Sequence, residues 1–91
     1  MKFTHITTPT GMVTIDKTDG YMACYKTNSE AVSSWAFLPQ HGALNVTWGD
    51  KTYIYMGVPF AIAVRLLATD SVGRFINKEV KPNYEVLKVA D

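Results

Sequence analysis

Hydrophobic and polar residues alternate most regularly in the middle of the chain. ALNVTW, 43–48, alternates apolar and polar side chains, and KTYIYM, 51–56, alternates again after Gly49-Asp50. A period of two predicts β-strands, and a two-residue Gly-Asp connection predicts that they pair as a hairpin. A loop of this length places Trp48 opposite Lys51. The more apolar face of the hairpin then carries Leu44, Val46, Trp48, Tyr53 and Tyr55.

After Gly57 the spacing of the apolar residues changes to that of a helix. Pro59 suits the first turn of a helix because no N–H donor is needed there, so we expect a helix over 59–69. Arg65 is its only charged residue, which predicts that most of its surface is buried. The expected apolar stripe is Phe60, Ala63, Val64 and Leu67, widened by Ile62 and Leu66.

A second helix is predicted over 71–80, with Asp70 or Ser71 as its N-terminal cap. Lys81-Pro82 ends it, because the residue before a proline disfavours the helical conformation. YEVLKV, 84–89, alternates again and predicts a last strand. The second helix buries Val72, Phe75, Ile76 and Val80 and directs Arg74, Lys78 and Glu79 outward.

The N-terminal third predicts short strands separated by turns. Apolar runs at 12–15, 21–25 and 33–39 are divided by the polar, turn-forming segments 16–20 and 26–30. With the hairpin and the helices, this pattern predicts an α+β fold. We expect an antiparallel β-sheet of several strands with two short C-terminal helices packed on one face.

This arrangement of motifs resembles the KTSC domain, a small module named for its place at the C-terminus of some lysyl-tRNA synthetases. The module also occurs alone in bacteria and phages. The resemblance covers residues 33–84 and implies a KTSC-like module at 33–91, with 1–32 as an N-terminal extension within one compact domain. The matching positions are Tyr53 and Tyr55 of a Tyr-x-Tyr centre, Val58-Pro59, Ser71 and Gly73, Phe75-Ile76-Asn77, and Lys81 with Tyr84.

Two features depart from the family pattern. The hairpin at Gly49-Asp50 is one residue shorter than usual, and the strand from Ser33 lacks the usual Gly-Tyr step. RNA binding has been suggested for the family, so the resemblance raises that expectation for this chain.

Composition narrows the functional class. The net charge of +1 gives no general argument for binding nucleic acid or a membrane surface. The longest apolar segment, 60–68, contains Arg65 and is far shorter than a membrane span. The start, MKFTHITTPTG, has no unbroken apolar run, so we expect no signal peptide. Cys24 is the only cysteine, which suits a reducing compartment. We therefore expect a soluble, cytoplasmic protein with no membrane partner.

The aromatic residues of the hairpin have two interpretations. Tyr53 and Tyr55 can offer rings on which bases stack, or they can be packed core residues with their hydroxyls at the edge. Trp48 beside Lys51 is the better candidate for an exposed aromatic next to a cation.

The second helix offers a candidate phosphate site. Ser71-x-Gly73 opens the helix with free N–H groups, and Arg74 can add a fork to a phosphate. The alternative is an ordinary cap, with Gly73 allowing close packing.

Farther along, Arg74, Lys78 and Lys81 form a basic stripe at spacings of four and three, which is also typical of a solvated helix face. Asn77 lies beside this stripe, where it can bind a ligand or fasten the helix to the hairpin.

Catalysis has little support. His5 and His41 lack the spacing of metal ligands, and Cys24 has no His nearby in the sequence. We expect no enzyme activity, no metal and no cofactor.

The leading hypothesis is a non-catalytic module that binds RNA or another phosphate-bearing nucleotide ligand. Its candidate residues are Trp48, Lys51, Tyr53, Tyr55, Ser71, Gly73, Arg74, Asn77, Lys78 and Lys81.

Two alternatives remain open. The first is a small phage-type protein that acts by protein–protein contact through its N-terminal third. The second is a homo-oligomer that sequesters a nucleotide signal between subunits.

Overall fold

Seven antiparallel strands form one sheet in which every strand pairs with the next along the chain. The computed structural model describes the backbone of residues 3–90 and the side-chain surroundings of residues 3–87. The strands are β1 (Phe3–Thr8), β2 (Gly11–Asp16), β3 (Met22–Cys24), β4 (Val32–Leu38), β5 (Ala43–Trp48), β6 (Lys51–Met56) and β7 (Glu85–Ala90). The helices are α1 (Phe60–Ala68) and α2 (Val72–Phe75), which continues directly into the π-helix η1 (Ile76–Val80). The predicted α+β class is confirmed.

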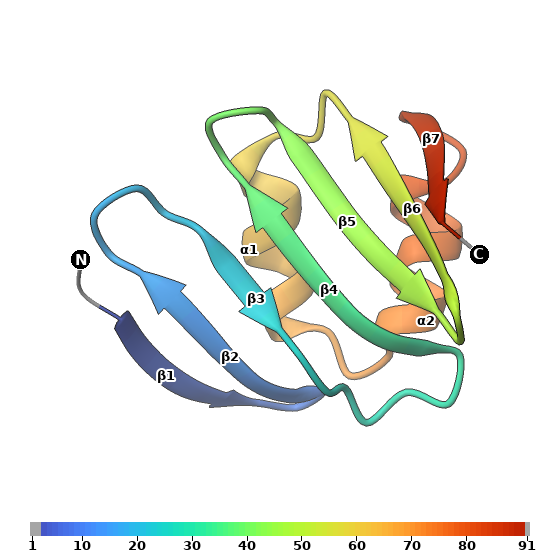
Figure 1. Cartoon of the computed structure of the whole chain (residues 1–91). Helices are drawn as coiled ribbons and strands as arrows, with labels where there is room; N and C mark the ends of the chain where they lie inside the picture. Colours follow the sequence, from blue (N-terminus) through green and yellow to red (C-terminus); the bar gives the residue numbers. More distant parts are fainter. Residues whose placement is uncertain (1–2, 91) are drawn as a thin grey trace.

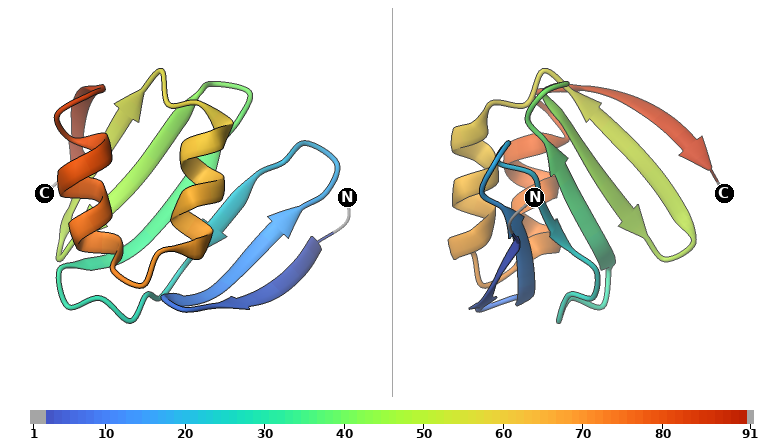
Figure 2. Two further views of the ribbon diagram at one scale, coloured as in Figure 1. Left: turned by 180° about the vertical axis from the view of Figure 1, so that it is seen from behind. Right: turned by 60° about the vertical axis from the view of Figure 1, so that its left-hand side comes forward.

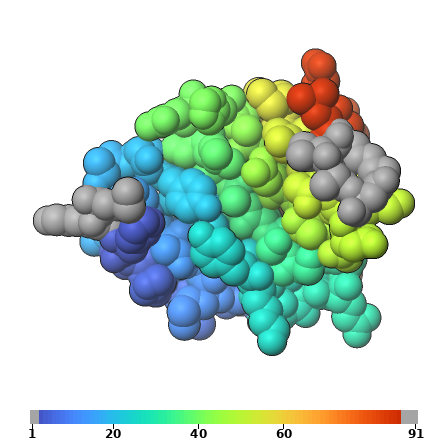
Figure 3. Space-filling view, in the orientation of Figure 1, coloured from blue at the N-terminus to red at the C-terminus, as the bar shows by residue number. Residues whose placement is uncertain are grey.

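The helices cover only one face of the sheet. Figure 1 shows the sheet in front with the helices behind it, and the opposite view in Figure 2 shows them lying over the β4–β6 half. The hairpin of β1 and β2 extends beyond α1 and bends toward the helix side (Figure 2). Figure 3 shows the other face of the sheet in the orientation of Figure 1, in which the helices of the described residues lie behind. We call it the uncovered face.

The central hairpin has the predicted register. Leu44 pairs with Tyr55, Val46 with Tyr53, and Trp48 with Lys51. Gly49 takes a φ of 64°, the left-handed conformation that a tight two-residue turn requires. Because side chains alternate across a strand, the predicted apolar face of the hairpin is the one that meets the helices.

The first helix differs from its prediction. It begins at Phe60, with Pro59 in the N-cap position outside it. Its buried residues are Ile62, Ala63 and Leu66, while Phe60 and Val64 are 54% and 45% exposed. The expectation that most of this helix is buried was therefore wrong. A single helix layer on a sheet has no further layer outside it, so only one narrow stripe of α1 is covered.

The second helix buries the predicted stripe of Val72, Phe75, Ile76 and Val80. Its geometry is not uniform, because the N–H of Lys81 donates to the carbonyl of Ile76 at 2.8 Å, a π-type bond. Ser71 occupies the N-cap position by its backbone, but its side chain makes no capping hydrogen bond. The predicted last strand is β7, which pairs with β6 at one edge of the sheet.

The N-terminal strands extend the same sheet. β3 pairs with β4 through Met22 opposite Phe37 and Cys24 opposite Trp35. Val13, Met22 and Cys24 belong to one buried cluster with the residues of β4, β5 and the helices. The first three strands therefore share the core of the rest of the chain.

Candidate functional site

A hollow of about 330 Å³ opens between the second helix and the last strands, and we call it the aromatic hollow. Its walls come from β5, β6, η1, β7 and the turn after η1. The lining residues are Trp48, Tyr53, Tyr55, Asn77, Lys81 and Val86. Five of the ten residues predicted from the sequence therefore meet in one place.

The three aromatic side chains of this hollow differ in exposure. Tyr55 is only 3% exposed and belongs to the core, whereas Trp48 and Tyr53 are half-buried and pack on its edge. Burial raises the pKa of the Tyr55 hydroxyl, and a polar contact with the Trp48 side chain opposes part of that rise. The core interpretation holds for Tyr55, while Trp48 and Tyr53 keep surface available beside the exposed Lys81.

A second, larger hollow of about 760 Å³ lies at the start of the second helix, and we call it the polar cleft. Ser71, Gly73, Arg74, Asn77 and Lys78 line its helix side. Its other wall is formed by the segment 28–31 between β3 and β4, with Thr10 from the first turn. Asn77 lines both hollows.

The loop wall of the polar cleft is held by its own hydrogen bonds. The Thr27 hydroxyl donates to the Val32 carbonyl and accepts the N–H of Ser29. Ser29 Oγ in turn accepts the N–H groups of Ala31 and Val32, each at 3.2 Å. The Asn28 N–H donates to the carbonyl of Thr10 at 2.7 Å. These bonds give the loop a defined shape before any ligand arrives.

Gly73 lies buried where the helix meets this loop. A Cβ at this position would contact the Cβ of Ala31 and the Oγ of Ser29, each at 3.5 Å. These are ordinary van der Waals distances, so the backbone of Gly73 packs closely against the loop. This favours the packing interpretation of Gly73, with the loop covering its backbone.

Lys51 is the one predicted residue that lines neither hollow. It is exposed at the hairpin tip opposite Trp48, as its register requires. Among the described residues, the cation that lines the aromatic hollow is Lys81, which follows the end of the second helix.

Sequence reasoning missed the residues of the loop wall, Asn28, Ser29 and Glu30. Their only signal in the sequence was the polar, turn-forming run at 26–30. Nothing in that run indicates that it folds against a helix that begins some forty residues later.

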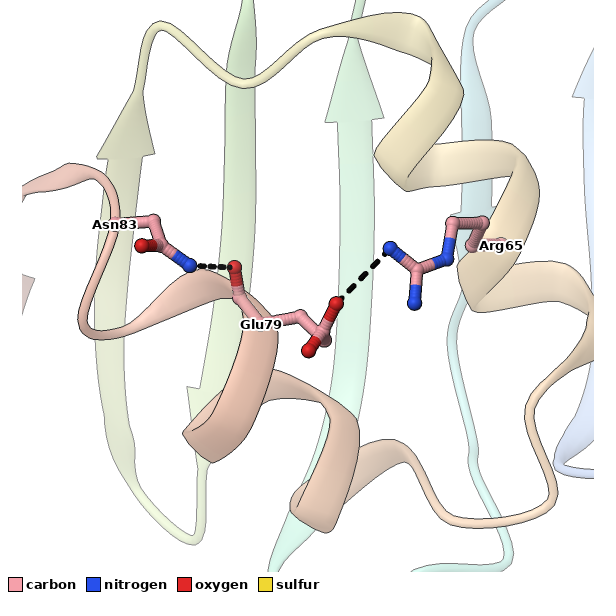
Figure 4. A network of polar contacts seen from close by, with 3 residues as sticks. All are labelled: Arg65, Glu79 and Asn83. Carbon is pink, nitrogen blue, oxygen red and sulfur yellow. Dashed lines mark hydrogen bonds and ion pairs between the residues drawn. The ribbon is translucent and has the colours of Figure 1, made fainter.

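The basic residues near the site are not equivalent. Arg65 on α1 places Nη1 2.9 Å from Oε1 of Glu79, and its guanidinium lies 5.3 Å from the ring centre of Phe75. Figure 4 shows this pair, with the Asn83 side chain donating to the Glu79 carbonyl at 2.9 Å. Within residues 3–87, Arg74, Lys78 and Lys81 make no such ion pair. Their exposed charges are open to an anion.

The π-helical turn at Ile76–Val80 coincides with the boundary between the hollows. Such turns are rare and occur frequently at functional sites. Here the turn carries Asn77 and Lys78, which line the hollows, together with buried Ile76 and Val80.

Two negative findings concern the described part of the chain. Among those residues, no group of three or more His, Cys, Asp or Glu side chains is placed to hold a metal ion. None of the helices there has the length and apolar character needed to cross a membrane.

Comparison with known proteins identifies the family. A model of the KTSC domain matches residues 28–84, which include every lining residue of the two hollows except Thr10 and Val86. The crystal structure of the KTSC domain protein YPO2434 from Yersinia pestis superposes with a TM-score of 0.66 at 25% identity, covering 69% of this chain and 90% of that one. A protein from Tsukamurella paurometabola, known only as "Protein", is 35% identical over 60 residues, covering 65% of this chain and 90% of the relative. The chain belongs to the KTSC domain family.

Proposed function

We propose that this chain is a non-catalytic binding module for RNA or a nucleotide, with a base held in the aromatic hollow. The observation that carries the proposal is the meeting of Trp48 and Tyr53 with Lys81 in one hollow. Two half-buried aromatic side chains offer surface for stacking, and the ammonium group offers a partner for phosphate.

The size of the hollow suits one nucleotide. Its volume of about 330 Å³ lies at the lower end of the range of roughly 300–1,000 Å³ found for ligand pockets. Stacking on an aromatic side chain contributes about 1–3 kcal/mol per base. A single base with its phosphate should therefore bind with modest affinity.

The distribution of charge supports an attraction for phosphate near the hollows rather than over the whole surface. The chain as a whole carries only +1, but Arg74, Lys78 and Lys81 are exposed on one helix beside the hollows. Each phosphate contact releases counterions, so binding weakens as salt rises. With these three cations among the residues described beside the hollows, we expect a shallow salt dependence.

The non-catalytic part of the proposal rests on the lining of the aromatic hollow, which is aromatic, amide, ammonium and aliphatic. Among the residues whose side-chain surroundings the structure describes, none that lines it is a carboxylate, imidazole or thiol able to act as a general base or nucleophile. A cytoplasmic location fits the same proposal, since RNA and nucleotides are abundant there and Cys24 stays reduced.

The test is a titration followed by tryptophan fluorescence, with adenosine monophosphate and a short single-stranded RNA as separate probes. Tyr53→Ala removes one wall of the hollow and should weaken binding by about 1–3 kcal/mol. Tyr25→Ala is the matched control, because Tyr25 is an exposed tyrosine beside β3. Equal losses in the two variants, or no binding by the unmodified chain, would reject the proposal.

A second candidate, self-association by protein contact, is favoured by the uncovered face. Four large hydrophobic residues are exposed there, on or beside strands β1, β2, β3 and β7: Phe3, Met12, Tyr25 and Leu87. β1 is also an open edge strand of six residues, which can pair with another copy. Native mass spectrometry at low salt distinguishes these hypotheses. A monomer with bound nucleic acid favours the RNA-binding module, and a ligand-free dimer favours self-association. A nucleotide bound at fixed stoichiometry to an oligomer favours sequestration.

A further inference from the structure

The two hollows share a wall. Asn77 lines both, and the helix that carries it forms one side of each. We propose that the ligand is a ribonucleotide chain at least two nucleotides long, with one base in the aromatic hollow and the adjoining nucleoside in the polar cleft. This inference rests on the proposed function and extends it from a single nucleotide to a chain.

The cations lie where such a chain would carry its phosphates. Lys81 lines the aromatic hollow, while Arg74 and Lys78 line the polar cleft. Asn77 stands between the two sets. All four residues are exposed on the helix or its end, so the route from one hollow to the other runs along positive and amide groups. A backbone that passes over Asn77 keeps its phosphate charges next to these groups.

The lining of the polar cleft favours a ribose over a free phosphate. Glu30 and Asp70 oppose the charges of Arg74 and Lys78, so the charged groups of the cleft sum to zero. An isolated phosphate would be repelled by the carboxylates as well as attracted by the cations. Carboxylate and amide oxygens are good acceptors for sugar hydroxyls, and a 2′-hydroxyl is what distinguishes RNA from DNA.

The size and rigidity of the polar cleft also favour a nucleoside as its ligand. The polar cleft has more than twice the volume of the aromatic hollow, about 760 against 330 Å³. That space accommodates a nucleoside. Its loop wall is already ordered by the bonds of Thr27 and Ser29, so little chain entropy is lost when a ligand binds.

The experiment compares three probes on the full chain: adenosine monophosphate, the ribodinucleotide ApA, and its deoxyribose counterpart. Binding is followed by calorimetry and by tryptophan fluorescence. ApA should bind about tenfold more tightly than the mononucleotide, since a second nucleoside adds contacts in the polar cleft. The deoxyribose dinucleotide should lose most of that gain. Glu30→Ala removes the acceptor oxygens, so it should weaken ApA and leave the mononucleotide unchanged.

Lys17→Ala is the control for non-specific charge effects, because Lys17 is exposed in the turn between β2 and β3 and lines neither hollow. Glu30 is exposed, so its substitution should not disturb folding. Equal affinity for ApA and the mononucleotide would overturn the two-nucleotide inference while leaving the proposed function in place. Equal affinity for the ribose and deoxyribose forms would overturn the inference that the polar cleft recognises a ribose. If none of the probes bound, the proposed function itself would fail.

Discussion

Two pairs of tyrosines on opposite faces of the same sheet have very different surroundings. Tyr53 and Tyr55 face the helices, and Tyr55 is buried in the core. Tyr21 and Tyr25 flank Ala23 on the uncovered face, where Tyr25 is 69% exposed. Their hydroxyls lie 3.4 Å apart, so the two rings reach toward each other across the fully buried Ala23. The layer packed on the sheet, rather than the residue type, therefore decides whether a tyrosine lies in the core, lines a hollow or is exposed on the surface.

The largest difference between the faces should appear in core truncations. Leu44 is fully buried on the covered face, so Leu44→Ala should lower the free energy of unfolding by about 2–5 kcal/mol. Met12 is 59% exposed on the uncovered face, and Met12→Ala should change it by no more than about 0.5 kcal/mol. Urea denaturation of both variants measures the contrast. A similar cost at the two positions would mean that the uncovered face is packed against something in solution.

Two glycines with positive φ, Gly11 and Gly49, differ in the space around them. Gly11 has a φ of 144°, and a Cβ there would lie 2.7 Å from the Lys26 carbonyl oxygen and 3.0 Å from Cys24 Sγ. Gly11→Ala should therefore cost about 1–3 kcal/mol through backbone strain, with the clash adding to it.

Gly49 provides the matched control, because a Cβ there meets nothing within 4 Å. Its left-handed φ of 64° alone costs about 1–2 kcal/mol when alanine replaces glycine. Thermal unfolding of the two variants should rank Gly11→Ala as the less stable protein. The reverse order would show that the segment around Gly11 yields more easily than its contacts suggest.

A smaller effect is expected at the outer side of the helices. The Arg65–Glu79 ion pair has side chains that are 57% and 30% exposed, so solvent screens much of their attraction. Glu79→Gln should lower stability by about 0–1 kcal/mol, with the loss shrinking as salt is added. Glu85→Gln serves as control, since Glu85 is exposed and makes no ion pair with the described residues. A cost well above this range would indicate that the pair holds the two helices together.

The last effect concerns proton binding at high pH and comes from Tyr21 and Tyr25 on the uncovered face. The hydrogen bond with Tyr25, followed by burial, raises the pKa of Tyr21 from 10.0 to about 12. Because the folded state keeps this proton longer than the unfolded chain, the contribution is fully present below pH 10. It is lost as the pH rises from 10 to about 12.

Tyr25→Phe should lower the pKa of Tyr21 toward its ordinary value, as measured by ultraviolet absorbance titration of tyrosinate. Tyr53→Phe, on the covered face, should leave that titration unchanged. If the pKa of Tyr21 stayed near 12 in Tyr25→Phe, burial and not the hydroxyl contact would be its cause.

Much of the fold followed from local pattern. The register of the β5–β6 hairpin could be predicted to the residue because a two-residue turn leaves only one pairing. The buried stripe of the second helix followed from its 3.6-residue period. The buried stripe of α1 did not, because this helix is apolar nearly all round and several stripes satisfy the same spacing. Only the packing on the sheet selects Ile62, Ala63 and Leu66.

The candidate site was predictable in part for the same reason. Trp48, Tyr53 and Tyr55 lie together because one hairpin carries them, and the second helix follows closely enough to bring in Asn77 and Lys81. The wall at 28–31 depends on a contact between segments some forty residues apart in the sequence. No periodicity reports such a contact, so half of the polar cleft emerged only from the folded structure.

The order of the strands has a consequence for how the protein folds. Every strand pairs with its neighbour along the chain, so the sheet has no crossover. The loops that join β1 to β6 in turn are short, whereas β6 and β7 are joined through both helices. The entropy lost in closing a loop grows with its length, and folding rates rise as contacts become more local in sequence. Strands β1 to β6 can therefore pair outward from their turns. The long-range step is the docking of the helices, together with the pairing of β7 with β6. Residues 28–31 and Gly73 meet only in that step, which makes the polar cleft a late product of folding.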